Sequence, residues 1–411
     1  MARVDVLVAG GGVSGMIAAI TAAQAGDRVV ILEKLNQPGK KLLATGSGRC
    51  NLMNRGSLRY RGDEAFARAV MGPDPVTALT LFWRRLGIVL RYDAEGRGYP
   101  CTYAATTVLD ALKLELKRRS VSVLTGCRIQ DVQRDGTHFL VKTESGERFL
   151  SDRVILAMGG AAQPALGGGL DAWPWLEKMG HRLIPATPAL TSLETDPRSV
   201  SGLSGIRVKC RLTVLTDGAP VYRESGELLF TDYGISGICV MQCSRYVQED
   251  GRSEGSIDLF PDLFPDTESL FAELAQRQRN RGEDSPTELL QGLCVPKLAY
   301  AVCKQAGFPL RGERARELTE NDLHRLAGKM KDYRVRILRR EGFRKAQVMA
   351  GGVDCSEVSP ETLSSRLCPG LHITGELLNV DGDCGGYNLM FASMTGIRAG
   401  ENGRMSFSDQ G

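Results

Sequence analysis

A glycine pattern close to the N-terminus, Gly10-x-Gly12-x-x-Gly15, constrains the fold of this chain more than any other feature. Short apolar runs precede and follow it, and helix-forming residues lie between them, which is the order of a β-α-β unit. The apolar runs suit strands that are buried on both faces, as in parallel sheets. The sequence therefore predicts a strand at 4–8, a helix at 14–25 and a strand at 29–32.

Each glycine of this pattern has a separate task in binding a dinucleotide. Gly10 permits a tight turn, Gly12 lets the backbone approach a pyrophosphate, and Gly15 lets the helix and the strand pack closely. The helix N-terminus offers unpaired N–H groups and partial positive charge to the phosphates. Glu33, which ends the second strand, is placed to accept hydrogen bonds from an adenosine ribose. Ser14 either contacts phosphate or only starts the helix.

Three later segments favour FAD over NAD as the dinucleotide. The segment GKKLLATGSGRCN at 39–51 is rich in glycine and lysine, which suits a loop around a pyrophosphate-linked flavin. The segment ILAMGG at 155–160 resembles the strand-to-glycine turn of glutathione-reductase-type FAD domains. The segment LHITGE at 371–376 resembles the second FAD fingerprint, in which a terminal carboxylate holds the ribityl chain. The candidate contacts in the last two segments are Gly159, Gly375 and Glu376.

A glycine pair before the last predicted helix suits a site for negative charge. The segment DGDCGGYNLM at 381–390 leads through Gly386 and Asn388 into a helix from about Leu389. Backbone N–H groups at that helix start would face the negative charge that a reduced flavin carries near N1 and O2. A plain helix N-terminus capped by Asn388 is compatible with this role.

The composition and the hydrophobic pattern of the sequence change twice, near Pro185 and near Ala346. Short alternating runs broken by Gly, Asp and Pro follow the first change, and a stretch rich in Leu, Glu and Arg comes after them. Motifs of the FAD type resume after the second change. We predict an α/β fold with a Rossmann-type FAD-binding domain at 1–186 and 346–411, an inserted β-rich domain at 187–260 and 336–345, and a small helical domain at 261–335.

Composition narrows the possible partners. The formal net charge is only +4, and no run of Lys and Arg with interleaved aromatic residues stands out, so we do not expect a nucleic-acid partner. The densest basic stretch, at 329–344, is interpreted as a solvated helix face. The 11 cysteines are scattered without a Cys-x-x-Cys pair, which argues against a zinc site and a disulfide framework. We therefore predict no metal site. Glycines interrupt the apolar stretch at 4–26, so we predict no membrane span and a cytoplasmic location.

The ordered motifs along nearly the whole chain, from about residue 3 to 400, resemble one flavoprotein family. GGGVSG, LEK, GKKLLATGSGRCN, LAMGGAAQPALGGG, GELLFTDYGISG, AGGVD and GELLNVDGDCGGYNL are similar to motifs of the BaiN/RdsA-like (aminoacetone oxidase-like) FAD-dependent oxidoreductases. Departures at Ser47, 161–164 and Met390 mean that no single member's substrate transfers. The resemblance implies a three-part architecture, FAD contacts at Glu33, Lys34, Lys41, Asn51, Glu376, Asn388 and Leu389, and an adenine-facing backbone at Ile129.

The catalytic acid and base are not assigned, because the sequence shows no acid–base constellation. Tyr387 and Lys41 are candidates for the flavin face. Cys50 alone lies where glutathione-reductase-type enzymes carry a redox pair, so we do not expect disulfide reduction. We predict hydride transfer between flavin N5 and either NAD(P)H or a small-molecule organic substrate, with a small organic molecule or oxygen as the other partner. The alternatives are a non-catalytic flavin-binding redox sensor and a flavoenzyme that acts on tRNA.

Overall fold

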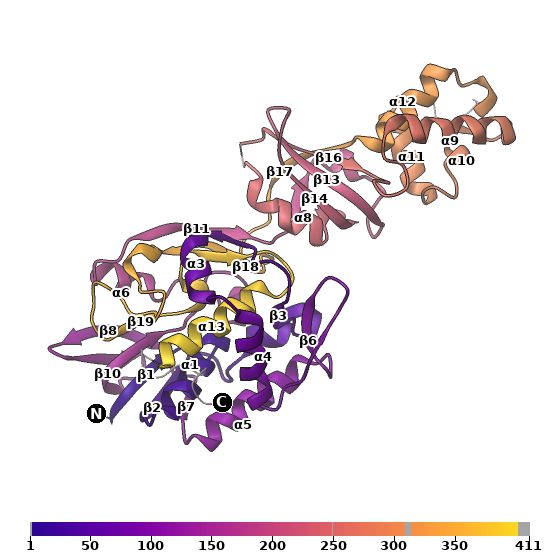
Figure 1. The fold of residues 1–411 in the computed structure, drawn as a ribbon. Coiled ribbons are helices and arrows are strands. Elements are labelled where there is room, and N and C mark those ends of the chain that lie inside the picture. Colours follow the sequence, from indigo (N-terminus) through magenta and orange to yellow (C-terminus); the bar gives the residue numbers. More distant parts are fainter. Residues whose placement is uncertain (1, 249, 309–313, 402–411) are drawn as a thin grey trace. The chain divides into compact units, whose positions relative to one another are not determined.

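The structure of the protein, a computed structural model, describes residues 2–248, 250–308 and 314–401 (Figure 1). The chain divides into two compact units. The first combines Met1–Pro188 with Gln347–Gly411, and the second is Ala189–Ala346. The predicted α/β class with a β-rich insertion is confirmed. The separation of that insertion into a β-rich and a helical domain stays a prediction.

The main sheet of the first unit is formed by strands from both ends of the chain. In sheet order they are β7 (Ser122–Thr125), β2 (Val29–Glu33), β1 (Ala2–Ala9), β10 (Arg148–Leu156), β9 (His138–Thr143) and β8 (Ile129–Asp135), with β19 (Leu371–Ile373) also beside β10. The central strand β1 pairs in parallel with both β2 and β10, and β19 pairs in parallel with β10. The carboxyl ends of β1, β2, β10 and β19, which are distant in sequence, therefore lie at the same edge of the sheet.

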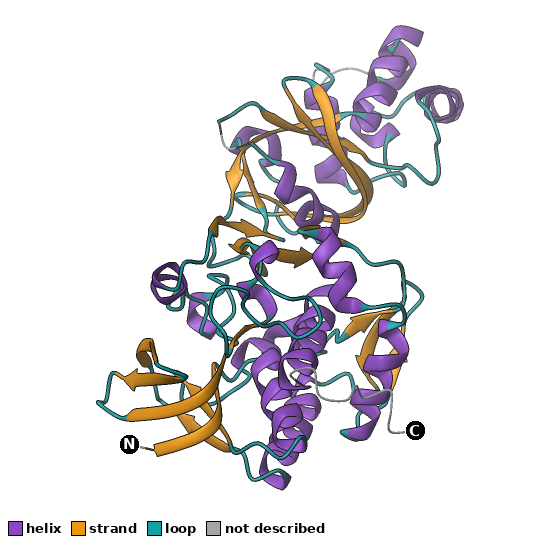
Figure 2. Cartoon of the chain, turned by 60° about the vertical axis from the view of Figure 1, so that its left-hand side comes forward, coloured by secondary structure: helices purple, strands orange, loops and turns teal. Residues whose placement is uncertain are grey.

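Helices and small sheets complete this unit, and Figure 2 distinguishes helices from strands by colour. The helices are α1 (Val13–Gln24), α2 (Lys40–Ala44), α3 (Glu64–Met71), α4 (Pro75–Arg85), α5 (Ala105–Arg118), α6 (Trp173–Lys178) and α13 (Tyr387–Glu401). The small sheets pair β4 (Tyr60–Gly62) with β20 (Val380–Gly382), β11 (Leu183–Ala189) with β18 (Val348–Val353), and β6 (Arg97–Pro100) with both β3 (Met53–Asn54) and β5 (Leu90–Tyr92).

The two terminal helices of this unit, α1 and α13, pack against each other at very close range. A Cβ added to Gly396 would lie 2.5 Å from the carbonyl oxygen of Ser14, and one added to Gly400 would lie 2.5 Å from the Cβ of Thr21. The two glycines are four residues apart and so lie on one face of α13. Larger residues at either position would push the helices apart.

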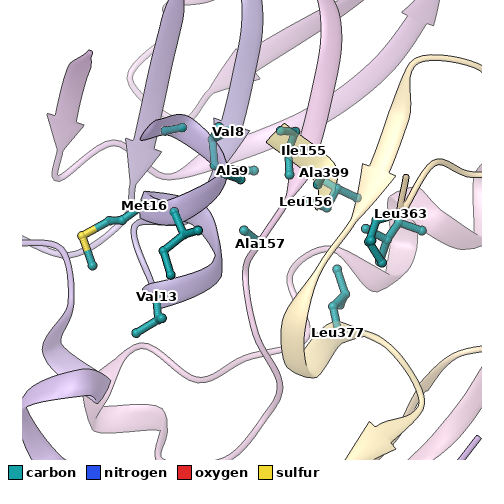
Figure 3. Close-up of a cluster of buried hydrophobic side chains, with 14 of the residues drawn as sticks. Val8, Ala9, Val13, Met16, Ile155, Leu156, Ala157, Leu363, Leu377 and Ala399 are labelled. Atoms are coloured by element: carbon teal, nitrogen blue, oxygen red, sulfur yellow. The ribbon is translucent and has the colours of Figure 1, made fainter. Parts of the chain in front are cut away.

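The core of the first unit closes around the carboxyl ends of β1 and β10 (Figure 3). Val8, Ala9, Ile155 and Leu156 have no solvent-exposed surface. All five residues of β2 are also buried, as a strand covered on both faces requires. Burying each large aliphatic side chain stabilises the fold by about 1.5–3 kcal/mol. This core fixes the strand ends from which the loops of the candidate site emerge.

The second unit contains a closed barrel and a set of helices that share one apolar core. Closure pairs the first barrel strand with the last, so the barrel presents no free edge. In barrel order the strands are β12 (Leu193–Thr195), β15 (Gly234–Ser236), β14 (Ala219–Phe230), β13 (Arg207–Thr216), β16 (Ser253–Asp258) and β17 (Tyr333–Arg340). The helices are α7 (Pro197–Val200), α8 (Ile238–Cys243), α9 (Thr267–Asn280), α10 (Pro286–Leu289), α11 (Pro296–Gln305) and α12 (Glu320–Lys331).

The basic stretch at 329–344 is not a helix face, and this interpretation was wrong. Helix α12 ends at Lys331, and β17 follows as a strand of the barrel. Buried Tyr333, Val335 and Ile337 alternate along it with arginines, which is the two-residue period of a half-buried strand. Among the described residues, no helix is long and apolar enough to span a membrane.

Candidate functional site

The three glycines of the N-terminal pattern are not equivalent. Gly10 has a φ of +101°, and an added Cβ would lie 2.6 Å from the carbonyl oxygen of Ala157. A Cβ on Gly15 would lie 2.0 Å from the carbonyl oxygen of Gly10. Gly12 has an ordinary φ of −74°, and beyond its neighbours its Cβ would meet nothing closer than Ala157 at 4.0 Å. Packing therefore requires the outer glycines, whereas Gly12 leaves the backbone at the start of α1 accessible, which suits a pyrophosphate.

Glu33 joins the end of β2 to this glycine turn. One carboxylate oxygen accepts a hydrogen bond from the backbone N–H of Gly11 at 2.7 Å, and the other accepts one from Leu35 at 2.8 Å. The side chain is buried, so these bonds hold it in one orientation. Each carboxylate oxygen can accept a further hydrogen bond, as binding of a ribose would require.

Lys34 is held beside the start of β8 by an aspartate that sequence reasoning missed. The Nζ of Lys34 donates to Asp171 at 2.7 Å, and Arg128 donates to the other oxygen of Asp171 at 3.0 Å. Burial alone would raise the pKa of Asp171, but the Lys34 hydrogen bond and the two positive charges lower that pKa below its ordinary value. Arg128 directly precedes Ile129, which is buried in β8. Asp171 thus connects Lys34, a predicted FAD contact, with Arg128, the residue before the predicted adenine-facing Ile129.

A second ion pair connects the helix after Gly39 with the C-terminal segment. The Nζ of Lys41 donates to one oxygen of Glu376 at 2.6 Å, and the backbone N–H of Met349 donates to the other at 2.7 Å. A Cβ added to Gly159 would lie 3.9 Å from the same carboxylate. Three other segments, those of Lys41, Gly159 and Met349, therefore converge on Glu376.

Gly375, the residue before Glu376, faces the first turn of α1. It has a φ of +66°, and an added Cβ would lie 3.0 Å from the Oγ of Ser14. Ser14 is buried at this contact. The structure therefore places Ser14 against Gly375, and a phosphate contact by its hydroxyl stays a prediction.

The glycine pair before α13 lies against Asn51. Gly386 has a φ of +101°, and an added Cβ would lie 2.7 Å from the Oδ1 of Asn51. This amide oxygen is buried and has no hydrogen-bond partner among the described residues. An unpaired buried acceptor costs about 1–3 kcal/mol, so a ligand that donates a hydrogen bond here would fit the site. Asn51 and Gly386, two of the residues predicted to contact FAD, thus lie side by side.

Asn388 does not cap α13, because that helix already begins at Tyr387. Its side chain instead brackets the backbone of Gly382. The N–H of Gly382 donates to Oδ1 at 2.8 Å, and Nδ2 donates to the carbonyl oxygen of Gly382 at 2.7 Å. Leu389 is half-buried and packs against the core. Both residues therefore fix the first turn of α13 to the segment before it.

The hydroxyl of Tyr387 and the thiol of Cys50 are both protonated at neutral pH. Burial raises the pKa of the Tyr387 hydroxyl above its ordinary value. Burial raises the pKa of the Cys50 thiol to about 12. Cys50 is therefore a thiol rather than the thiolate that disulfide exchange requires. Within the described ranges, no group of three or more His, Cys, Asp or Glu side chains is arranged to hold a metal.

Comparison with known proteins relates this site to a family. The chain matches the family described as HI0933-like protein Rossmann domain over residues 4–402. It is 36% identical to a 3-dehydro-bile acid delta(4,6)-reductase from Clostridium scindens, over 97% of this chain and 98% of that protein. It is 28% identical to a ribosomal RNA dihydrouridine synthase from Escherichia coli, over 95% and 96% of the two chains.

The fold is also similar to that of a solved flavoprotein. The open conformation of a flavocytochrome c3 fumarate reductase matches with a TM-score of 0.50 and 16% identity. The match covers 98% of this chain and 78% of the other. At this level of identity the likeness concerns the fold alone, and it agrees with the mixed α/β sheet described above.

Proposed function

The chain belongs to the HI0933-like family of Rossmann-domain proteins, and its relatives in that family are flavin-dependent oxidoreductases. We propose that it uses FAD to reduce a carbon–carbon double bond that is conjugated to a carbonyl group. The names of two relatives support this reaction. A 3-dehydro-bile acid with unsaturation at position 4 is a conjugated ketone. Uridine likewise carries its 5,6 double bond next to the carbonyl at position 4, so both reductions have the same chemical form.

The overall reaction balances with a nicotinamide as the electron source. NAD(P)H supplies two electrons and one proton, and water supplies the second proton. One hydrogen adds to the carbon β to the carbonyl and the other adds to the α carbon. A bound FAD would relay the two electrons. The sequence contains no second glycine pattern of the Gly10 type, so we infer that the nicotinamide docks only transiently.

The observation that carries the cofactor proposal is the contrast between packed and open groups in the site. Packing within the protein does not require glycine at position 12, because an added Cβ would meet no close neighbour. The Oδ1 of Asn51 is buried without a hydrogen-bond partner among the described residues. A dinucleotide would contact the backbone at Gly12, and a hydrogen-bond donor of the flavin would satisfy Asn51. The ion pair of Lys41 with Glu376 would fix the helix after Gly39 to the C-terminal segment.

The adenosine end distinguishes FAD from FMN. Glu33 is oriented by two backbone N–H groups, Lys34 is held by Asp171, and Ile129 directly follows Arg128, which binds the same aspartate. FMN lacks the adenosine and would leave all of these groups without a ligand. We therefore propose FAD as the flavin.

Anaerobic absorbance spectroscopy of the purified flavoprotein tests the proposed reaction. NADH or NADPH should bleach the flavin band, and adding a conjugated ketone should restore it with formation of the saturated product. The matched control is the same ketone without the double bond, which should leave the flavin reduced. Flavin that no nicotinamide bleaches, or that only oxygen reoxidises, would contradict the proposal and favour a redox sensor or an oxidase.

A further inference from the structure

An exposed face of the small sheet formed by β3, β6 and β5 carries arginines and tyrosines. Arg91 of β5 lies directly opposite Tyr99 of β6 in the strand register. Arg97 is two residues from Tyr99 on the same strand and therefore shares its face. Tyr103 joins them, because its ring centroid lies 5.6 Å from that of Tyr99 and 5.9 Å from the guanidinium of Arg91. These four residues are here termed the Arg–Tyr face.

Two members of the Arg–Tyr face are presented to solvent in an unusual way. Tyr103 is 39% exposed although its backbone φ is +51°, a left-handed conformation that is costly for a bulky residue. Backbone strain of this kind concentrates at functional sites. Arg91 is exposed and forms no ion pair with a carboxylate in the described part of the chain. Its charge is available to a ligand.

The Arg–Tyr face is continuous with the flavin end of the candidate site. Asn54 lies opposite Arg97 in the register, and its Nδ2 donates to the carbonyl oxygen of Gly385 at 2.9 Å. A Cβ added to Gly385 would lie 4.0 Å from the Cγ of Arg97. On the other side, a Cβ added to Gly46 would lie 3.8 Å from the ring of Tyr99. The face therefore starts where the glycine pair before α13 ends.

A guanidinium without a carboxylate partner, that of Arg91, beside the rings of Tyr99 and Tyr103 favours a ligand that combines flat rings with anions. Bases stack on aromatic side chains, and arginine binds phosphate while also stacking. We propose that the Arg–Tyr face binds single-stranded RNA next to the base that is reduced. This inference rests on the proposed function. A base must leave its stack before it can reach a flavin, and its neighbours then need an alternative stacking surface.

This proposal departs from the expectation that nucleic acid is not a partner, which rested on overall charge and on the absence of a basic run. The arginines of the face are separated in sequence by Asp93 and Glu95, which hides the pattern. In the fold, Asp93 accepts hydrogen bonds from the backbone N–H groups of Glu95 and Arg97 and so serves the turn. Both carboxylates lie near the guanidinium of Arg97, at 3.8 and 3.6 Å, and Arg91 is left without a carboxylate partner among the described residues.

The test is fluorescence polarisation of a labelled single-stranded RNA oligomer containing one uridine, titrated with the FAD-loaded protein. The double variant Arg91→Ala/Tyr103→Asn should bind about tenfold more weakly or worse, because it loses one stacking surface and one phosphate contact. Asn is chosen because it tolerates a positive φ. Arg91→Ala alone should also reduce the salt dependence of binding by about one counterion.

Arg148→Ala is the matched control, since Arg148 is also an exposed strand arginine of the first unit. It should change RNA affinity by less than about twofold. Equal RNA binding by the wild type and the double variant would overturn the proposal, as would an equal loss in the control. Loss of binding to a steroid carboxylate instead of RNA would assign the face to a small acid and would also overturn it.

The same preparations separate this inference from the proposed function. Flavin content and anaerobic reoxidation by a neutral conjugated ketone should be the same in the wild type and the double variant. Failure of the wild type in that assay removes the proposed function. Success there, combined with equal RNA binding by both proteins, removes only the docking inference.

Discussion

Two carboxylates, Glu33 and Glu376, stand close to predicted ends of the cofactor, yet they are held in opposite ways. Glu33 receives both of its hydrogen bonds from backbone N–H groups within 22 residues of it, and Gly10 and Gly15 of the turn beside it are closely packed. Glu376 receives its bonds from Met349 and from Lys41, which is 335 residues away. The partners of Glu33 thus come from the N-terminal β-α-β unit, whereas the partners of Glu376 come from segments that are distant in sequence. We expect substitutions of the packed glycines Gly10 and Gly15 to act on folding, and substitutions of Gly12 and Glu376 to act on flavin binding.

The largest expected effect comes from the packed glycines of the N-terminal region. Gly15→Val would force a side chain into the carbonyl oxygen of Gly10 and should destabilise the protein by about 3 kcal/mol or more. Gly12→Val meets no such obstacle and should yield a folded protein without flavin. Thermal unfolding and the flavin absorbance of both variants give the comparison. A Gly12→Val protein with full flavin occupancy would show that the turn is only structural.

A pH titration distinguishes the two regions. No histidine precedes residue 138, whereas His372 lies close to Glu376 in the C-terminal segment. Burial lowers the pKa of His372 in β19 to about 4, and its Nδ1 is 2.9 Å from the carbonyl oxygen of Thr362, to which it donates. The ordinary pKa is about 6.5, so the unfolded chain binds the proton first on acidification. The free energy of unfolding should therefore fall as pH drops from about 6.5 to about 4, by roughly 3 kcal/mol in total.

The check is the pH dependence of denaturant unfolding in the wild type and in His372→Gln. Between about pH 4 and 6.5, the difference in the number of bound protons between the unfolded and folded states should be smaller by close to one in the variant, so the free energy of unfolding should depend less steeply on pH. An unchanged slope would show that His372 does not titrate in this window.

The ion pair in the C-terminal region gives a smaller effect, confined to the cofactor. Glu376→Ala should weaken FAD binding about ten- to a hundredfold, since hydrogen bonds to a charged group contribute about 1.5–3 kcal/mol. Glu361→Ala is a control, because Glu361 is an exposed carboxylate of the same segment. Fluorescence titration of the apoproteins measures both. If Glu376→Ala instead unfolds the chain with its FAD affinity intact, the two regions do not differ as described.

The smallest expected effect concerns the loop that precedes Asn51. Ser47 has a φ of +56°, where a non-glycine residue is strained. Ser47→Gly should therefore stabilise the protein slightly, by about 0.5–1 kcal/mol, with FAD affinity unchanged. Denaturant unfolding of the loaded protein checks this. A loss of stability would mean that the serine side chain has a role not seen in its contacts.

Sequence reasoning succeeded where the causes are local. The β-α-β order and the glycine spacing predicted the turn at Gly10 and the position of Glu33, because steric rules link them over a few residues. It failed where partners are remote. Nothing in the sequence connects Asp171 with Lys34 or Arg91 with Tyr99, since only the folded chain brings them together. The sequence suggests a capping role for Asn388, because the glycine pair obscures the start of α13. The structure places that side chain on Gly382 instead.

Identification of the cofactor released by denaturing the purified protein tests the central claim most directly. Chromatography with mass detection should find FAD, close to one per chain, and the Gly12→Val protein should release little or none. Recovery of FMN alone, or of NAD without any flavin, would contradict the assignment of the adenosine end to Glu33, Lys34 and Ile129.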